Sequence, residues 1–190
     1  MNESDERYST AEEAIIDAFF LLVHEKELEK ISVTDVIKKA GIVRSTFYNH
    51  YENIPALIIA AEDKTLDDIF HMMKTFHPKN DKDLCRSFFL AVCNYTKENP
   101  FLATLLENAR GDGLFEKAMT MFHKYVTTVT DTNANVAISR NDFSFMIAGA
   151  IGSTVGILHK WTAEDFSSPA EYVAEKLTVI FMNGVLPFLG

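Results

Sequence analysis

Residues 31–57 read ISVTDVIKKAGIVRSTFYNHYENIPAL, and this stretch decides the fold of the N-terminal part of the chain. Ser32, followed three residues later by Asp35, predicts a helix N-cap in a variant of the capping box with an acid at the third helical position. Gly41 predicts the end of that helix, because glycine tolerates the left-handed backbone found at helix C-termini. A second short helix is expected from about Arg44 to Tyr51. Two short helices joined by a tight turn containing glycine have the layout of a helix-turn-helix.

The second short helix has an unusual polar side. Phe47 and Tyr51 lie four residues apart, as in a helix that buries one face. The other side chains carry hydrogen-bonding groups but include no Glu or Lys, the residues expected on the surface of an acidic protein. They are Arg44, Ser45, Thr46, Tyr48, Asn49 and His50. Groups of this kind suit the base edges and phosphates of DNA, and an ordinary solvated helix face is the alternative.

The charge of the chain is unevenly distributed. The net charge is −9 over 190 residues. Residues 30–51 nevertheless hold four basic side chains against one acid, +3, whereas residues 1–29 hold two against nine, −7. Binding to DNA needs a local positive patch and not a basic chain, so the overall charge does not exclude it. Lys38 and Lys39 are candidate phosphate ligands within that patch, with solvated surface lysines as the alternative.

Composition favours an all-α, cytoplasmic protein. The chain is 47% hydrophobic and has only five Pro and eight Gly, and its apolar residues recur at helical spacing. Cys85 and Cys93 are too few for a disulfide framework, and the N-terminus resembles no signal peptide. The longest uncharged run, residues 143–159, is short and polar for a membrane span, so we expect a buried helix. The spacing of His and Cys predicts no metal site.

About nine helices are expected in two domains. Residues 1–53 are expected to form a three-helix helix-turn-helix domain, and residues 54–190 are expected to form a larger helical body. Gly111 and Gly113 are expected to lie before a helix that begins near Leu114. The polar segments HPKNDKD and TDTNANVAISRN are expected to be loops.

With these elements in view, the chain resembles the tetracycline-repressor (TetR) family of transcriptional regulators. The resemblance covers residues 10 to about 60 and rests on Thr34, Val36, Ile37, Ala40-Gly41-Ile42, Thr46-Phe47-Tyr48, His50-Tyr51 and Leu57. A second stretch, GILHKWTAEDFSSPAEYVAEKL, is similar to the last two helices of a TetR subgroup related to regulators of dihydroxyacetone metabolism.

The resemblance implies roles for residues of the helix-turn-helix. Thr34 is expected to touch a phosphate, Arg44, Ser45 and Thr46 to face base edges, and Tyr48 and His50 to face the DNA backbone. Two positions depart from the family pattern. Val43 stands where the family usually has a Ser N-cap, and Ile54 stands where it usually has a phosphate-binding Lys.

The family also implies a homodimer and an effector site in the helical body. The small residues of the penultimate helix suit close packing of helices, either within the subunit or across a dimer. The residues expected at the dimer interface are Gly149, Gly152, Ser153, Gly156, Trp161, Val173, Leu177, Ile180 and Phe181. The residues expected around an apolar effector, with a filled core as the alternative, are Phe89, Tyr95, Phe101, Leu105, Met119, Phe122, His123 and Met146.

The sequence therefore predicts a ligand-responsive, DNA-binding regulator, with repression as the expected mode and a palindromic double-stranded operator as the target. No enzyme motif, cofactor motif or membrane segment is found. The alternative is a TetR-fold interaction protein or co-activator that binds DNA weakly or only together with a partner protein, because Val43 and Ile54 weaken the expected grip on DNA.

Overall fold

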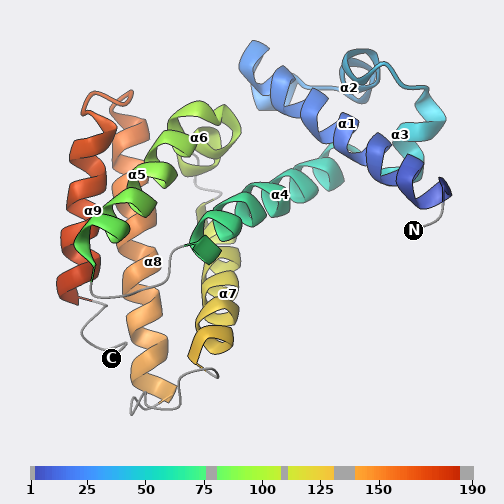
Figure 1. Cartoon of the computed structure of the whole chain (residues 1–190). Coiled ribbons are helices and arrows are strands. Elements are labelled where there is room, and N and C mark those ends of the chain that lie inside the picture. Colours follow the sequence, from blue (N-terminus) through green and yellow to red (C-terminus); the bar gives the residue numbers. More distant parts are fainter. Residues whose placement is uncertain (1–2, 76–80, 108–110, 131–139, 185–190) are drawn as a thin grey trace. The chain divides into compact units, whose positions relative to one another are not determined.

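The computed structural model describes residues 3–75, 81–107, 111–130 and 140–184, and its regular structure in these ranges is entirely helical (Figure 1). Nine α-helices and one short 3₁₀ helix follow one another within these described ranges. The predictions of an all-α fold and of nine helices are confirmed. Contacts divide the chain into two compact units, Met1–Thr65 and Leu66–Gly190. This division falls within the fourth α-helix, whereas the sequence placed the domain boundary at the start of that helix.

The first unit contains the helix-turn-helix. Its elements are α1 (Glu3–Glu25), η1 (Leu28–Lys30), α2 (Val33–Ala40), α3 (Arg44–His50) and the first half of α4 (Ile54–Thr75). Helix α1 packs against both α2 and α3. Their shared core is built from fully buried apolar side chains, namely Ile15, Phe19, Val36, Phe47 and Leu57.

The second unit is a bundle built around α8. Its further helices are α5 (Lys82–Glu98), α6 (Pro100–Glu107), α7 (Gly111–Thr130), α8 (Arg140–Ala163) and α9 (Ala170–Gly184). Helix α8 packs against α6, α7 and α9, and α5 lies along α9 (Figure 1). Helix α7 begins at Gly111, and Gly113 lies in its first turn, so the expectation that both glycines precede this helix was wrong. The expected loops at HPKNDKD and TDTNANVAISRN fall largely outside the described residues.

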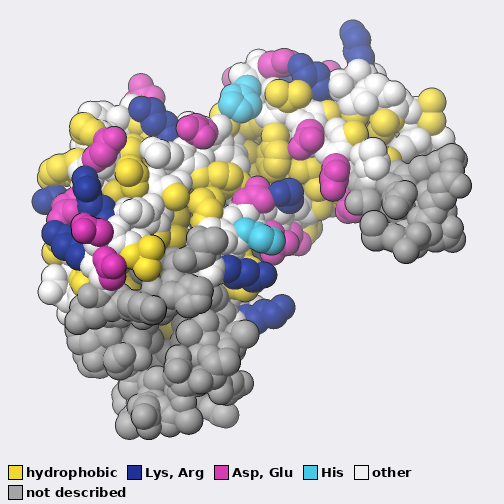
Figure 2. Space-filling model, viewed as in Figure 1, with side chains coloured by type: hydrophobic (Ala, Val, Ile, Leu, Met, Phe, Trp, Pro, Cys, Tyr) yellow, Lys and Arg dark blue, Asp and Glu magenta, His cyan; other side chains and the backbone are white. Residues whose placement is uncertain are grey.

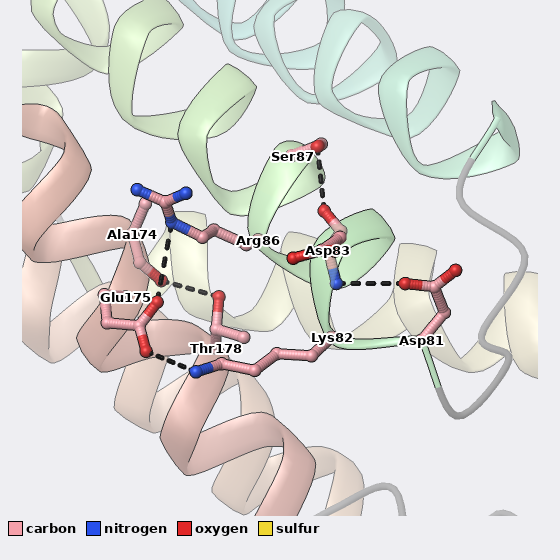
Figure 3. Close-up of polar contacts among 8 residues, drawn as sticks. All are labelled: Asp81, Lys82, Asp83, Arg86, Ser87, Ala174, Glu175 and Thr178. Carbon is pink, nitrogen blue, oxygen red and sulfur yellow. Dashed lines mark hydrogen bonds and ion pairs between the residues drawn. The ribbon is translucent and has the colours of Figure 1, made fainter.

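The contact between α5 and α9 combines an apolar core with an ionic edge. The rings of Phe89 and Phe181 meet with centroids 5.8 Å apart. At the edge, Glu175 pairs with Lys82 at 2.7 Å and with Arg86 at 3.5 Å (Figure 3). The ammonium of Lys82, more than any other group, lowers the pKa of the Glu175 carboxyl. Because these groups are partly exposed, the apolar core contributes most of the stability of this contact.

The acidic residues do not form one continuous field on the face seen in Figure 2. Acidic and basic side chains are interspersed over the second unit there, with hydrophobic side chains between them. None of the helices in the described ranges combines the length and the hydrophobicity that a membrane span needs.

Candidate DNA-binding surface

Helix α2 begins and ends as its sequence predicts. The Ser32 side chain accepts a hydrogen bond from the Asp35 backbone N–H at 3.3 Å, and the Ser32 N–H donates to Asp35 Oδ2 at 2.9 Å. This reciprocal pair is the capping box predicted from the sequence. At the other end, Gly41 adopts φ +67°, and its N–H donates to the Ile37 carbonyl. Both ends of the helix that precedes the turn are therefore fixed by local interactions.

The Asp35 carboxylate has a second role that the sequence did not reveal. Lys26, from the segment before α2, places its ammonium 2.7 Å from Asp35 Oδ2. The hydrogen bond from Lys26 and those from Ser32 hold the pKa of the Asp35 carboxyl well below its usual range. The pairing was missed because Lys26 lies nine residues away and no helical periodicity links the two positions. This contact ties the end of α1 to the start of the helix-turn-helix.

Helix α3 is held down by two aromatic residues, as expected. Phe47 is fully buried and Tyr51 is nearly so, with their ring centroids 6.0 Å apart. The Tyr51 hydroxyl also donates to the Glu12 carboxylate at 3.3 Å, which fixes the end of α3 to α1. One face of this seven-residue helix is thereby anchored to the first unit.

The opposite face of α3 is open. Arg44, Ser45, Tyr48 and Asn49 are exposed, while Thr46 and His50 are half-buried. All six predicted contact residues therefore keep at least part of their side chains accessible. The helix presents a guanidinium, hydroxyls, an amide and an imidazole, a set of groups that can hydrogen-bond to base edges and phosphates.

Thr34 lies beside Arg44, although ten positions separate them in the chain. Arg44 Nη2 donates a hydrogen bond to Thr34 Oγ1 at 3.2 Å, and both residues are exposed. The bond joins α2 to the start of α3. It uses one of the five N–H donors of the guanidinium and leaves four for an external partner.

The two lysines at the end of α2 differ in their surroundings. Lys39 Nζ lies 2.5 Å from Glu25 Oε1, so its charge is compensated within the chain. Lys38 is exposed, and no acid pairs with it in the described part of the chain. Of the two candidates, Lys38 is the one whose charge remains available for a phosphate.

The two departures from the family pattern have different consequences. Val43 is the N-cap of α3 and makes no side-chain cap, and its side chain is 66% exposed. Ile54 is half-buried at the first position of α4. The start of α4 is capped instead by Asn53, whose Oδ1 accepts from the Ala56 N–H at 2.9 Å, as its sequence position suggests.

The residues expected around an effector differ in accessibility. Phe89, Phe101 and Leu105 are buried in the second unit. The hydroxyl of Tyr95 donates to Asp68 at 3.0 Å. The remaining four are Met119, Phe122 and Met146, which are half-buried, and His123, which is exposed.

The residues expected at the dimer interface fall into two groups. Trp161, Val173, Leu177 and Phe181 are buried within the chain itself. The accessible members are Gly149, Gly152, Ser153, Gly156 and Ile180. Sequence reasoning missed three large exposed apolar side chains of α8 and α9, which are Phe145 at 73%, Tyr172 at 56% and Val179 at 43%. The signal that could have found them is helical spacing. Phe145 lies four residues before Gly149, and Tyr172 and Val179 are seven residues apart, as residues on one helix face are.

Trp161 has a structural role in the turn between α8 and α9. Its indole N–H donates to the Ser168 carbonyl at 2.8 Å, and its ring meets Phe166 edge-on at 4.9 Å. Asp165 and Phe166 adopt positive φ there, at 50° and 54°. The indole therefore stabilises a turn with an uncommon backbone conformation.

The two cysteines are buried in α5. Burial raises the pKa of the Cys85 thiol to about 11 and that of Cys93 to about 12, so both are protonated at neutral pH. Within the described residues, no group of three or more His, Cys, Asp or Glu side chains is placed to hold a metal ion.

Comparisons with known proteins agree with this geometry. A TetR family model described as "Transcriptional regulator C-terminal region" matches residues 83–183. The chain is 27% identical over 179 residues to the uncharacterized HTH-type transcriptional regulator YvdT of Bacillus subtilis (strain 168), covering 89% of this chain and 83% of that protein.

Solved structures show the same fold. A TetR-family regulator from Streptomyces coelicolor matches with a TM-score of 0.70 and 14% identity, over 100% of this chain and 90% of that one. FadR from Bacillus subtilis, solved in complex with stearoyl-CoA, matches with a TM-score of 0.59 and 15% identity, over 94% of this chain and 99% of that one.

The fold and the family match together identify a helix-turn-helix transcriptional regulator. The chain belongs to the TetR family of transcriptional regulators. Its likeness to the dihydroxyacetone-related subgroup stays a prediction.

Proposed function

We propose that the protein is a homodimeric transcriptional repressor that binds a palindromic operator through α2 and α3 and is released or retained by a small effector in the helical body. The observation that carries the proposal is the two-sided character of α3. Phe47 is fully buried while Arg44, Ser45, Tyr48 and Asn49 are exposed. A helix fixed on one side and rich in hydrogen-bonding groups on the other has the properties of a recognition helix.

The chemistry of each side chain on this surface favours a particular kind of contact with DNA. Arg44 can donate two hydrogen bonds to guanine O6 and N7, and the Thr46 methyl suits a thymine. Ser45 and Asn49 can reach base edges or sugar-phosphate oxygens, and Tyr48 and His50 suit phosphate oxygens. Lys38, whose charge is uncompensated within the described residues, adds a phosphate contact, and Lys39 adds a weaker one because Glu25 already pairs with it.

The exposed side of α8 and α9 supports the dimer. Phe145, Gly149, Gly152 and Gly156 recur at helical spacing on α8. A Cβ atom added at Gly149 or Gly156 would meet no described atom within 4 Å, so packing inside the subunit does not require glycine there. Each glycine costs about 1 kcal/mol in a helix interior, and close approach of a second subunit would offset that cost.

On α9, the exposed side chains form a matching stripe. Tyr172 and Val179 are 56% and 43% exposed and share one face of the helix, and Ile180, which is 41% exposed, borders the buried face of Val173 and Leu177. Apolar side chains of this size gain free energy when a second subunit covers them. The exposed small and apolar residues of α8 and α9 therefore form the proposed dimer interface. The predicted interface residues that are buried, such as Val173 and Leu177, pack beneath this surface within the subunit.

An apolar effector is supported by the Phe- and Met-rich interior of the second unit. The polar groups among the predicted lining residues are the Tyr95 hydroxyl, which donates to Asp68, and the imidazole of the exposed His123. Because FadR of B. subtilis was solved with stearoyl-CoA, long-chain acyl-CoA thioesters are the first ligands to try. By altering the separation of the two recognition helices, an effector would change the fit to the two half-sites.

Fluorescence anisotropy tests the proposal directly. The purified protein is titrated against duplex DNA from upstream of its own gene and against random duplex of equal length, at several salt concentrations. Tight binding with selectivity for the upstream DNA is expected. Arg44→Ala should weaken the free energy of binding to this DNA by about 1–3 kcal/mol. Equal affinity for both duplexes would overturn the proposal. Light scattering of the same samples should show a dimer at micromolar concentration.

A partner-dependent regulator is the second candidate, and the uncapped start of α3 favours it. Val43 makes no side-chain cap, and Ile54 replaces a cation that would grip phosphate. This candidate predicts weak, unselective binding by the purified protein. Selectivity would then appear only when a partner from a lysate of the native host is added to the anisotropy assay.

A further inference from the structure

Val43 combines a missing interaction with an unusual exposure. It occupies the N-cap of α3 with extended backbone, φ −87° and ψ 157°, and its side chain caps no N–H group. Its isopropyl group is 66% exposed, one of the most exposed large apolar side chains in the described chain. Ser, Thr, Asp and Asn are the preferred N-caps, and valine is among the poorest. The residue therefore lowers the stability of α3, and packing within the chain offsets little of that loss.

The position of Val43 indicates what its isopropyl group could contact. It directly precedes Arg44, and the guanidinium of Arg44 is held against Thr34 at 3.2 Å. In helix-turn-helix proteins the N-terminal residues of the recognition helix are the ones that reach base edges in the major groove. If Arg44 reads a guanine, we expect Val43, the residue directly before it, to lie close to an adjacent base pair. Thymine is the base that presents a methyl group in the major groove.

We propose that Val43 is a specificity-determining residue that packs against the C5 methyl of a thymine next to the base pair read by Arg44. The inference rests on the proposed function, because it requires that α3 enter the major groove of an operator. Under this proposal, the valine that replaces the usual Ser N-cap gives the protein a preference for thymine at one operator position. A Ser N-cap at this position would stabilise the helix but could offer no comparable apolar contact.

Replacing thymine by uracil provides the test, because it removes the methyl and leaves base pairing intact. A high-affinity operator is first selected from random duplex DNA with the wild-type protein, and each thymine is then changed to uracil singly. At one thymine in each half-site, distinct from any that contacts the Thr46 methyl, the wild-type protein should lose about fourfold in affinity, the loss expected for one methyl group that is no longer buried. For Val43→Ala and Val43→Ser, the operators with thymine and with uracil at that one position should bind equally well.

Val43→Thr is the matched control, because it keeps one γ-methyl and adds a capping hydroxyl. It should retain part of the preference for thymine while raising the melting temperature. The inference would be overturned if every methyl-sensitive thymine of the operator showed a uracil effect of the same size in the wild-type protein and in Val43→Ser, or if no thymine were methyl-sensitive. If the wild-type protein selects no sequence at all, the proposed function itself fails, and the two failures are thereby distinguished.

Discussion

Arg44 donates a hydrogen bond from Nη2 to Thr34 Oγ1 at 3.2 Å, so the first residue of α3 is held by the second residue of α2. The family resemblance predicts that Thr34 contacts a DNA phosphate, whereas in the structure its hydroxyl accepts a hydrogen bond from Arg44. A long arginine side chain loses rotamer freedom when it binds a base. A neighbour that already restrains it reduces that loss, so Thr34 is expected to act on DNA binding through Arg44.

A double-mutant cycle distinguishes the two roles. Thr34→Val removes the hydroxyl at nearly constant shape and should cost about 1 kcal/mol of operator binding in the wild-type background. In an Arg44→Ala background the same substitution should cost almost nothing, because the group that Thr34 restrains is gone. Thr34→Ser keeps the acceptor and serves as the control. Equal losses from Thr34→Val in both backgrounds would show that Thr34 contacts the phosphate directly.

The salt dependence of binding should separate the two lysines of α2. Lys38 has no acidic partner among the described residues, whereas Lys39 is paired with Glu25 at 2.5 Å. Lys38→Ala is expected to reduce the slope of log K against log salt by about 0.9, the value for one phosphate contact. Lys39→Ala, the matched control, should change the slope by less. Anisotropy titrations between low and moderate salt measure both, and identical slopes for the two variants would contradict the assignment.

The Asp35 contacts make the stability of the first unit sensitive to acid. Lys26 and Ser32 lower the pKa of this carboxyl in the folded state. Its contribution is therefore complete above the ordinary aspartate pKa of about 4 and is lost as the pH falls from there toward the folded-state value. Asp35→Asn should melt at a lower temperature than the wild-type protein at pH 7, and the difference should narrow below about pH 4.

Circular dichroism during thermal unfolding at several pH values checks this expectation. Glu27→Gln is the control, because the pairing of Glu27 with Lys30 leaves both side chains more than 60% exposed. Its melting temperature should match that of the wild-type protein at every pH. A difference between Asp35→Asn and wild type that stays constant down to pH 3 would show that the ionised carboxylate is not the source of the stability.

Local rules explain which parts of the fold could be predicted from the sequence. The cap at Ser32, the stop at Gly41 and the buried Phe47 each depend on residues within four positions, and all three are confirmed. The glycines before Leu114 misled because a glycine weakens a helix without excluding it, and α7 begins at Gly111 with Gly113 in its first turn.

Contacts between distant segments could not be predicted in the same way. Val173, Leu177 and Phe181 form an apolar stripe in the sequence, but a stripe does not reveal its partner. The structure pairs α9 with α5, about 90 positions earlier, and so buries these side chains inside the subunit. The Lys26–Asp35 and Arg44–Thr34 contacts were missed for the same reason, since each joins residues nine or ten positions apart that belong to different elements.

The glycines of α8 offer the sharpest test of the dimer. A Cβ atom at Gly149 or Gly156 has open space within the described chain, so Gly→Ala should stabilise an isolated subunit by up to about 1 kcal/mol through helix propensity. At a closely packed interface the same methyl group would instead weaken the dimer by about 1–3 kcal/mol. Gly113→Ala is the matched control, because this glycine also lies in a helix and also has open space. Sedimentation velocity over a range of concentrations should show dissociation of Gly149→Ala and Gly156→Ala at concentrations where wild type and Gly113→Ala remain dimeric. If all three variants only raise the melting temperature and leave the dimer intact, the subunits meet through a different surface.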